Sequence, residues 1–398
     1  MEGESSSEAR LRHQLDVQSQ QINRVLSHHQ IPATVAGGSV RPRVVSFDLQ
    51  TQIASGLERA RNLKDDLMTA LGVSNVALTN EGGRWQLRVS QPDDAPVPLL
   101  KLLAAVPDLP PLTAAIGVAD GGAPVLLRFS PGHTSHILIA GEPGAGKTSL
   151  LRAIAAGLAL TNRQSGLQLQ IMDPAYPDDA GQSPLLPLAY LPHMLTDPAL
   201  DGDACAAVIH FLAEEMAYRR RECVHFPRII VLIDHVVTYL ESTGPEARGD
   251  LLRLLQYGAQ AGIHLVLAAD RPGSPLLDST IRASLSSRMV GRTGDAAAAR
   301  RIAGASHEQA ALLYGGGDFL ALSGDDATYF QAAYIGDYDL HLKLTEMVES
   351  ARPTLLARPY SDRPKVPKPA PKKRSFTLHD GGIDIQEDQD DVVADGNE

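Results

Sequence analysis

The most regular hydrophobic pattern lies between residues 125 and 270, where short apolar runs alternate with amphipathic segments. Strands that are buried on both faces of a sheet have continuous apolar runs. Largely apolar runs of this kind are found at residues 125–129, 137–140, 167–172, 228–233 and 264–269. Apolar residues at helical spacing are found at residues 150–158, 204–221 and 247–262. This alternation predicts an α/β domain with a mostly parallel sheet and helices on both faces.

The first third of the chain has a different pattern, in which glycine and proline interrupt shorter apolar segments. Helices are predicted at residues 10–28, 57–71 and 99–105, and strands at 31–35, 44–49, 76–78 and 85–89. We therefore expect a flexible N-terminus over residues 1–20, a small α+β domain over 21–112 and the P-loop domain over 113–355. Residues 356–398 are rich in proline and charge, which predicts a disordered C-terminal tail.

The turn between the run 137–140 and the next helix carries the clearest chemical signal. Its residues are Gly141, Glu142, Pro143, Gly144, Ala145, Gly146, Lys147, Thr148 and Ser149. Glycines let backbone N–H groups curl around a phosphate, towards which the next helix directs its positive end. The Lys147 ammonium can reach the β- and γ-phosphates, and the Thr148 hydroxyl is suited to Mg²⁺. The loop therefore predicts a site for ATP and Mg²⁺.

A P-loop also needs a carboxylate that holds Mg²⁺ from across the site. Asp234 directly follows the apolar run 228–233, and we expect it to bind Mg²⁺ together with Thr148; a helix N-cap is the alternative role. The next residue, His235, can accept a proton but brings no fixed negative charge, so this position either handles the attacking water or has no chemical role. Asp270, at the end of the next buried run, is a second candidate for positioning that water.

Composition narrows the class of protein. The formal net charge is −11, which counts against a broad nucleic-acid-binding surface but leaves room for a basic strip inside a channel. Two cysteines provide no disulfide framework, and no apolar stretch approaches the roughly 20 residues of a membrane span, so we expect a soluble cytoplasmic protein.

In the tail, residues 363–374 contain bases without acids, and residues 380–398 contain acids without bases. Such a segment is either a solvated linker or an arm that docks on phosphate or on a protein partner.

Several motifs, in order along the chain, resemble the FtsK/SpoIIIE-type DNA translocases. They lie at residues 45–49, 63–71, 138–148, 172–174, 191–195, 215–220, 261–268, 271–272, 282–288 and 315–320. The resemblance implies a RecA-like ATPase core that forms a homo-hexamer, with double-stranded DNA in a central pore, held through its phosphates without base reading. It also implies that an arginine from the neighbouring subunit faces the γ-phosphate. Arg288 is our first candidate for this arginine and Arg300 the second.

The chain departs from the family's pattern at several positions. His235 replaces a glutamate, Asp270 a glutamine and Ala175 a lysine, and the usually basic loop 241–250 contains Arg248 among three acids. The family's membrane-spanning region and C-terminal winged-helix domain have no counterpart in this sequence. We therefore keep three hypotheses: an ATP-driven translocase of double-stranded DNA, a nucleotide-binding ring or assembly protein with slow or no hydrolysis, and a pump for proteins.

Overall fold

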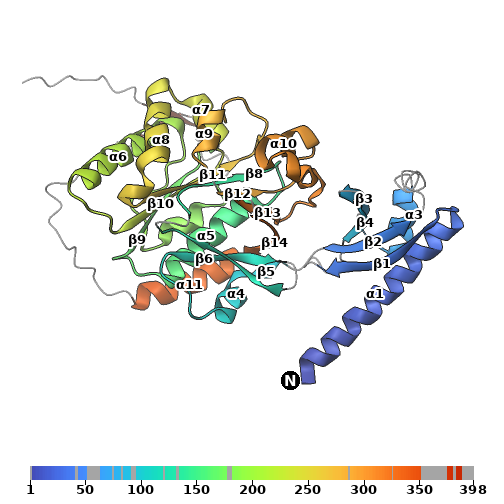
Figure 1. Ribbon diagram of the computed structural model, residues 1–398. Helices are drawn as coiled ribbons and strands as arrows, with labels where there is room; N and C mark the ends of the chain where they lie inside the picture. Colours follow the sequence, from blue (N-terminus) through green and yellow to red (C-terminus); the bar gives the residue numbers. More distant parts are fainter. Residues whose placement is uncertain are drawn as a thin grey trace, which may run out of the picture.

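The computed structural model shows two units, a small N-terminal one and a larger one that contains the P-loop (Figure 1). The described residues are 2–40, 44–51, 63–73, 76–81, 84–90, 96–119, 122–130, 134–176, 182–285, 287–324, 326–350, 374–379 and 382–387. The α/β P-loop domain and the preceding small α+β unit predicted from the sequence are both confirmed.

The small unit is a four-stranded antiparallel sheet packed against helices. Its elements are α1 (Glu2–His28), β1 (Ala33–Val40), β2 (Val44–Thr51), α3 (Lys64–Leu71), β3 (Val76–Glu81) and β4 (Arg84–Ser90), with strand order β1-β2-β4-β3. Ile22 and Leu26 of α1 are fully buried in a core that includes Trp85. Helix α1 begins at Glu2, so it includes most of the segment for which we expected a flexible N-terminus. The first part of the helix predicted at residues 57–71 lies outside the described residues.

The larger unit is built on a ten-stranded mixed sheet. Its strands are β5 (Val97–Pro98), β6 (Thr113–Ala119), β7 (Pro124–Arg128), β8 (Ile137–Ala140), β9 (Leu167–Met172), β10 (Arg228–Ile233), β11 (Ile263–Ala269), β12 (Ser287–Val290), β13 (Asp318–Ser323) and β14 (Asp326–Tyr334). The order is β7-β6-β14-β13-β12-β8-β11-β10-β9, with β5 beside β14. The strands from β12 to β9 are parallel, so the loops that follow β8, β10 and β11 meet at one edge. We did not predict the antiparallel pairs β12–β13, β13–β14 and β14–β6.

Helices cover both faces of this sheet (Figure 1). They are α4 (Leu99–Ala105), α5 (Lys147–Thr161), α6 (Gly202–Arg221), α7 (Val236–Ser242), α8 (Pro245–Tyr257), α9 (Ser279–Ala283), α10 (Ala296–Ala303) and α11 (Asp337–Ser350), with short 3₁₀ helices η3 (Leu186–Tyr190), η4 (Ala259–Ala261) and η5 (Ala305–Leu312). Along β10, Ile229, Val231 and Ile233 belong to one core and Ile230 and Leu232 to the other. This two-sided burial explains the continuous apolar run in the sequence.

The boundary between the units lies earlier than the expected residue 112. Strand β5 pairs with β14, and Leu99 and Leu102 of α4 are buried in the same core as α5. The sequence pattern placed this stretch in the small unit, but Leu99 and Leu102 find their packing partners on the larger one.

The two units touch near the start of β13. The Tyr314 hydroxyl donates a hydrogen bond to the Arg88 carbonyl oxygen at 2.9 Å. The Arg88 guanidinium lies 5.8 Å from the ring centroid of Tyr329 on β14. Both contacts join β4 of the small unit to the antiparallel half of the large sheet, which contains β13 and β14.

The segment 356–398, for which we expected disorder, lies largely outside the described residues. Its described part is a hairpin of β15 (Arg374–His379) and β16 (Gly382–Glu387). Among the helices that the structure describes, none combines the length and the apolar character needed to cross a bilayer.

Candidate nucleotide-binding site

The P-loop joins β8 to α5 and is held open by glycines with left-handed backbone torsion angles. Gly144 has φ +80° and Gly146 has φ +99°, and a Cβ on Gly146 would lie 2.6 Å from the backbone nitrogen of Gly317. Lys147 begins α5, and its Nζ donates a hydrogen bond to the Glu142 carbonyl oxygen at 3.0 Å. Burial lowers the pKa of Lys147, whereas Asp234, Asp270 and Glu142 oppose this shift. The ammonium group is therefore held within the loop that would surround a phosphate.

A loop of three glycines between η5 and β13 contacts the backbone of the P-loop. The Gly316 N–H donates to the Gly144 carbonyl oxygen, and the Gly317 N–H donates to the Ala145 carbonyl oxygen, both at 2.8 Å. Gly315, Gly316 and Gly317 all have positive φ angles. In the sequence these glycines stood out only as part of a motif, and their contact with the nucleotide site was not predicted. Three consecutive glycines were the available signal, but they did not reveal the partner.

Thr148 and Asp234 meet as expected for a shared metal ion. The Thr148 hydroxyl donates to Oδ2 of Asp234 at 2.5 Å, and Asp234 is fully buried at the end of β10. Burial raises the pKa of Asp234, and His235 and Thr148 act against that shift. The alternative N-cap role is not observed, because the N-cap of α7 is His235. Hydroxyl and carboxylate oxygens are ligands that Mg²⁺ prefers, so this pair fits the ion.

His235 is held by a carboxylate that the sequence analysis did not single out. Its Nδ1 lies 2.9 Å from Oδ1 of Asp173, and its backbone is left-handed with φ 48°. Asp173 is fully buried at the end of β9, and its Oδ2 accepts a hydrogen bond from the Ser183 hydroxyl. The hydrogen bond to Asp173 raises the pKa of His235. Since Nδ1 faces Asp173, only Nε2 can face a substrate or a water molecule.

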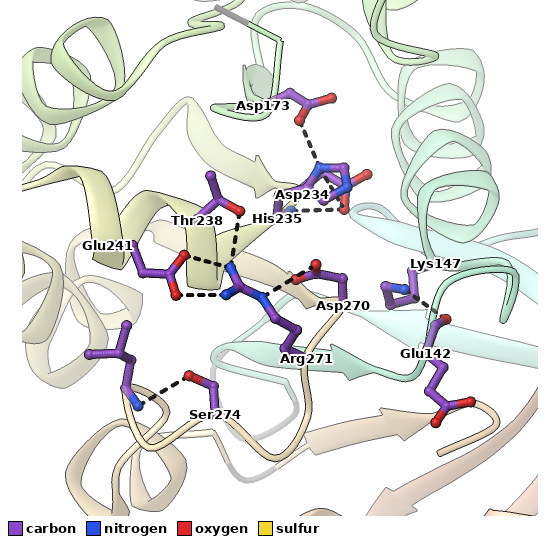
Figure 2. Close-up of polar contacts among 11 residues, drawn as sticks. Glu142, Lys147, Asp173, Asp234, His235, Thr238, Glu241, Asp270, Arg271 and Ser274 are labelled. Carbon is purple, nitrogen blue, oxygen red and sulfur yellow. Dashed lines mark hydrogen bonds and ion pairs between the residues drawn. The ribbon is translucent and has the colours of Figure 1, made fainter. Parts of the chain in front are cut away.

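Asp270 lies at the end of β11, on the same edge of the sheet as the P-loop. Figure 2 shows its carboxylate between Arg271 and Lys147. Its Oδ2 lies 3.6 Å from Nε of Arg271, which also makes two hydrogen bonds to Glu241. Its Oδ1 is buried and has no hydrogen-bond partner among the described residues. An unsatisfied buried oxygen beside a P-loop is suited to a bound water or to a ligand group.

The arginines proposed to act on a neighbouring subunit occupy different positions. Arg288, on β12, donates hydrogen bonds to the carbonyl oxygens of Leu285 at 3.2 Å and Ile302 at 3.0 Å, and burial lowers its pKa. Arg300 is exposed on α10. In the loop 241–250, Arg248 forms an ion pair with Asp278 at 2.7 Å. The action of Arg288 or Arg300 in trans stays a prediction.

Comparison with known proteins gives a consistent assignment. The FtsK alpha domain model matches residues 1–85, and the FtsK/SpoIIIE family model matches residues 108–226. The DNA translocase FtsK of Lactiplantibacillus plantarum is 24% identical over 359 residues, which cover 82% of this chain and 44% of the relative. The DNA translocase FtsK of Mycobacterium tuberculosis is 22% identical over 386 residues, which cover 87% of this chain and 46% of the relative. The chain thus spans less than half the length of these curated relatives.

Solved structures share the fold. The pCW3 conjugation coupling protein TcpA, in its monomer form with ATPγS, aligns with a TM-score of 0.55 at 19% identity and covers 83% of this chain and 99% of its own. The cytoplasmic domain of the Type VII secretion ATPase EccC of Thermomonospora curvata aligns with a TM-score of 0.54 at 20% identity, covering 64% of this chain and 34% of its own. The two family models match in chain order, and the translocase relatives align over more than four fifths of the chain. The fold is that of a P-loop ATPase. The chain therefore belongs to the FtsK/SpoIIIE family.

Proposed function

We propose that this protein is a P-loop ATPase that uses ATP hydrolysis to move double-stranded DNA. The observation that carries the proposal is the contact between the Thr148 hydroxyl and the Asp234 carboxylate beneath a complete P-loop. In P-loop ATPases a hydroxyl and a carboxylate of these kinds hold the Mg²⁺ of the nucleotide complex, which supports the proposal. The translocase relatives support the choice of DNA as the substrate.

The residues of the loop divide the work of binding. Lys147 would exchange its hydrogen bond with the Glu142 carbonyl oxygen for the β- and γ-phosphates of ATP. Thr148 and Asp234 would hold Mg²⁺, which neutralises charge that develops on those phosphates when it is bound. The backbone contacts of Gly316 and Gly317 would keep the loop in shape, because they fix two of its carbonyl groups.

Asp270 is the better placed of the two groups proposed to position the attacking water. Its unpaired Oδ1 can accept a hydrogen bond without breaking an existing one, and it lies close enough to Lys147 to affect the pKa of that residue. His235 can assist through Nε2, with Asp173 orienting the ring through Nδ1. A carboxylate supplies the negative charge that the imidazole lacks.

The proposed assembly and its contacts with DNA are those expected for a member of the family. A homo-hexamer would place DNA in a central pore, where contacts with phosphates provide binding that does not depend on sequence. Arg288 or Arg300 of one subunit would face the γ-phosphate bound by the next, where an arginine stabilises the charge of the transition state.

The test is ATP turnover with and without double-stranded DNA. We expect DNA to stimulate turnover, and Lys147→Ala and Asp234→Asn to reduce it to background in both conditions. Folding of each variant is checked by circular dichroism. Tight ATP binding with negligible turnover, or turnover indifferent to DNA, would contradict a translocase. The first outcome would instead favour a nucleotide-binding assembly protein.

A further inference from the structure

A cavity opens at the edge of the large sheet opposite the P-loop. Its volume is about 320 Å³, within the range of small-molecule sites. It lies where β10 and β11 begin, whereas the P-loop follows the end of the parallel strand β8. We call it the strand-start pocket, and its polar lining residues are Ser130, Ser135, His225, Arg228, Gln260 and His264. None of these residues is acidic.

Arg228 brings a buried charge to the strand-start pocket without a counter-charge. It is 7% exposed, its Nε has no hydrogen-bond partner, and no carboxylate among the described residues pairs with it. Its guanidinium lies 4.9 Å from the ring centroid of Phe226. Nearby Arg219 is also fully buried, but it is paired with Glu215 at 2.7 Å. Buried charges are normally paired, so the pocket lacks an anion at Arg228.

His264 brings an unpaired acceptor to the same pocket. Its Nδ1 lies 2.8 Å from the Ser135 carbonyl oxygen, and a carbonyl only accepts, so Nδ1 carries the proton. Burial lowers the pKa of His264 to about 4, which leaves the ring neutral near pH 7. Nε2 is then a hydrogen-bond acceptor, and it is buried without a partner among the described residues. A ligand that satisfies both groups must carry negative charge and must also donate one hydrogen bond.

We propose that the strand-start pocket binds a phosphate that keeps one proton, either inorganic hydrogen phosphate or a small phosphate monoester. Its P–O–H group donates to Nε2 of His264, and its charged oxygens accept hydrogen bonds from Arg228. Ser130, Ser135 and Gln260 line the rest of the cavity. A nucleic-acid phosphodiester carries no such proton, so the two sources of phosphate are distinguishable.

The test is calorimetric titration of the full chain with inorganic phosphate, at constant ionic strength. Lys147→Ala is present in every sample, because the P-loop is itself an anion site. We expect one phosphate to bind in this background with a Kd below the millimolar range. Adding Arg228→Met should weaken binding by at least about tenfold, the effect of losing a hydrogen bond to a charged group. Sulfate, which has no proton near pH 7, should bind more weakly than phosphate.

Matched variants separate this role from a structural one. Arg221→Met removes an exposed arginine that is paired with Glu222 and should leave phosphate binding unchanged. Arg228→Met should melt no lower than its parent without phosphate, because it removes an unpaired buried charge. Arg228→Lys, which keeps the charge but loses Nε, serves as a second variant if Arg228→Met fails to fold, and it should also weaken binding.

Three results would overturn the proposal. They are no phosphate binding in the Lys147→Ala background, binding indifferent to both Arg228 variants, and binding weaker than millimolar. A short DNA duplex is titrated in parallel. If Arg228→Met weakens duplex binding but not phosphate binding, the pocket is a contact for the DNA backbone and the assignment to hydrogen phosphate is wrong.

Discussion

Replacing Asp270 with asparagine removes one negative charge at the end of β11 and leaves the shape of the side chain almost unchanged. If Asp270 positions and activates the attacking water, kcat should fall by roughly 10²- to 10⁴-fold, as for the loss of other general bases. That fall corresponds to about 2.7–5.4 kcal/mol in the activation free energy. ATP affinity should stay the same or rise, because a carboxylate near the phosphates repels them.

The cost of Asp270→Asn to folding should be small. The pair with Arg271 is long at 3.6 Å, and Arg271 keeps both hydrogen bonds to Glu241. An ion pair with one exposed partner contributes about 0.2–1 kcal/mol. Since about 1 kcal/mol moves the Tm of a domain of this size by roughly 2–4 °C, we expect a shift no larger than that. A loss of turnover can then be attributed to chemistry.

The assay is phosphate release at saturating Mg²⁺ and ATP, beside equilibrium binding of a fluorescent ATP analogue. Glu241→Gln is the matched control, because it removes a carboxylate from the other side of Arg271, and kcat should be unchanged. A kcat for Asp270→Asn within about twofold of the unmodified chain would refute the reasoning, since a general base contributes far more. If His235→Ala then abolishes turnover, the water belongs to the imidazole.

Two further variants test the support of the site and the helical layer beside it. Gly317 has φ +98°, where a side chain costs about 1–2 kcal/mol, so Gly317→Ala should lower the free energy of unfolding by about that amount in a denaturant titration. Gly249→Ala, which meets no neighbour and has no positive φ, should not lower it. The hydrogen bond to Asp250 raises the pKa of His210, so the stability that this contact contributes is present below the ordinary value of about 6.5 and is lost as pH rises through the raised pKa. His210→Gln should therefore lower the Tm at about pH 5.5 and leave it unchanged at about pH 9. Arg253→Gln, which removes another partner of Asp250, should lower the Tm at both pH values. Equal effects of His210→Gln at the two pH values would show that the charge of the imidazole does not cause the loss of stability.

The P-loop and the buried acid that contacts Thr148 could be predicted because their information is local. Glycines at fixed spacing determine where the loop takes left-handed torsion angles, and the apolar run before Asp234 identifies a buried strand with an acid at its end. The parallel half of the sheet followed from the same runs. The C-terminal end of α6 was predicted at Arg221, and its observed N-terminal end at Gly202 lies close to the predicted start at residue 204.

Other parts of the site depend on contacts between distant segments. The pairing of His235 with Asp173 spans 62 residues, and it forms because β9 and β10 are parallel neighbours that end at the same edge. The support of the P-loop by Gly316 and Gly317 depends on how β13 and β14 return to the sheet, which no local pattern in the sequence predicts.

The position of α4 and the strand-start pocket also could not be predicted, because both depend on contacts between distant segments. The apolar face of α4 is visible in the sequence, but only packing decides that it joins the core of α5. Arg228 lies at the start of β10 and His264 at the start of β11, and neither sequence context shows that the two residues line a shared cavity. The nucleotide loop, the acid that contacts Thr148 and the fold class follow from the sequence alone, because torsion preferences and burial patterns are properties of short segments. Which polar groups meet and which stay unpaired is visible only in the folded structure, because it depends on the order of strands in the sheet.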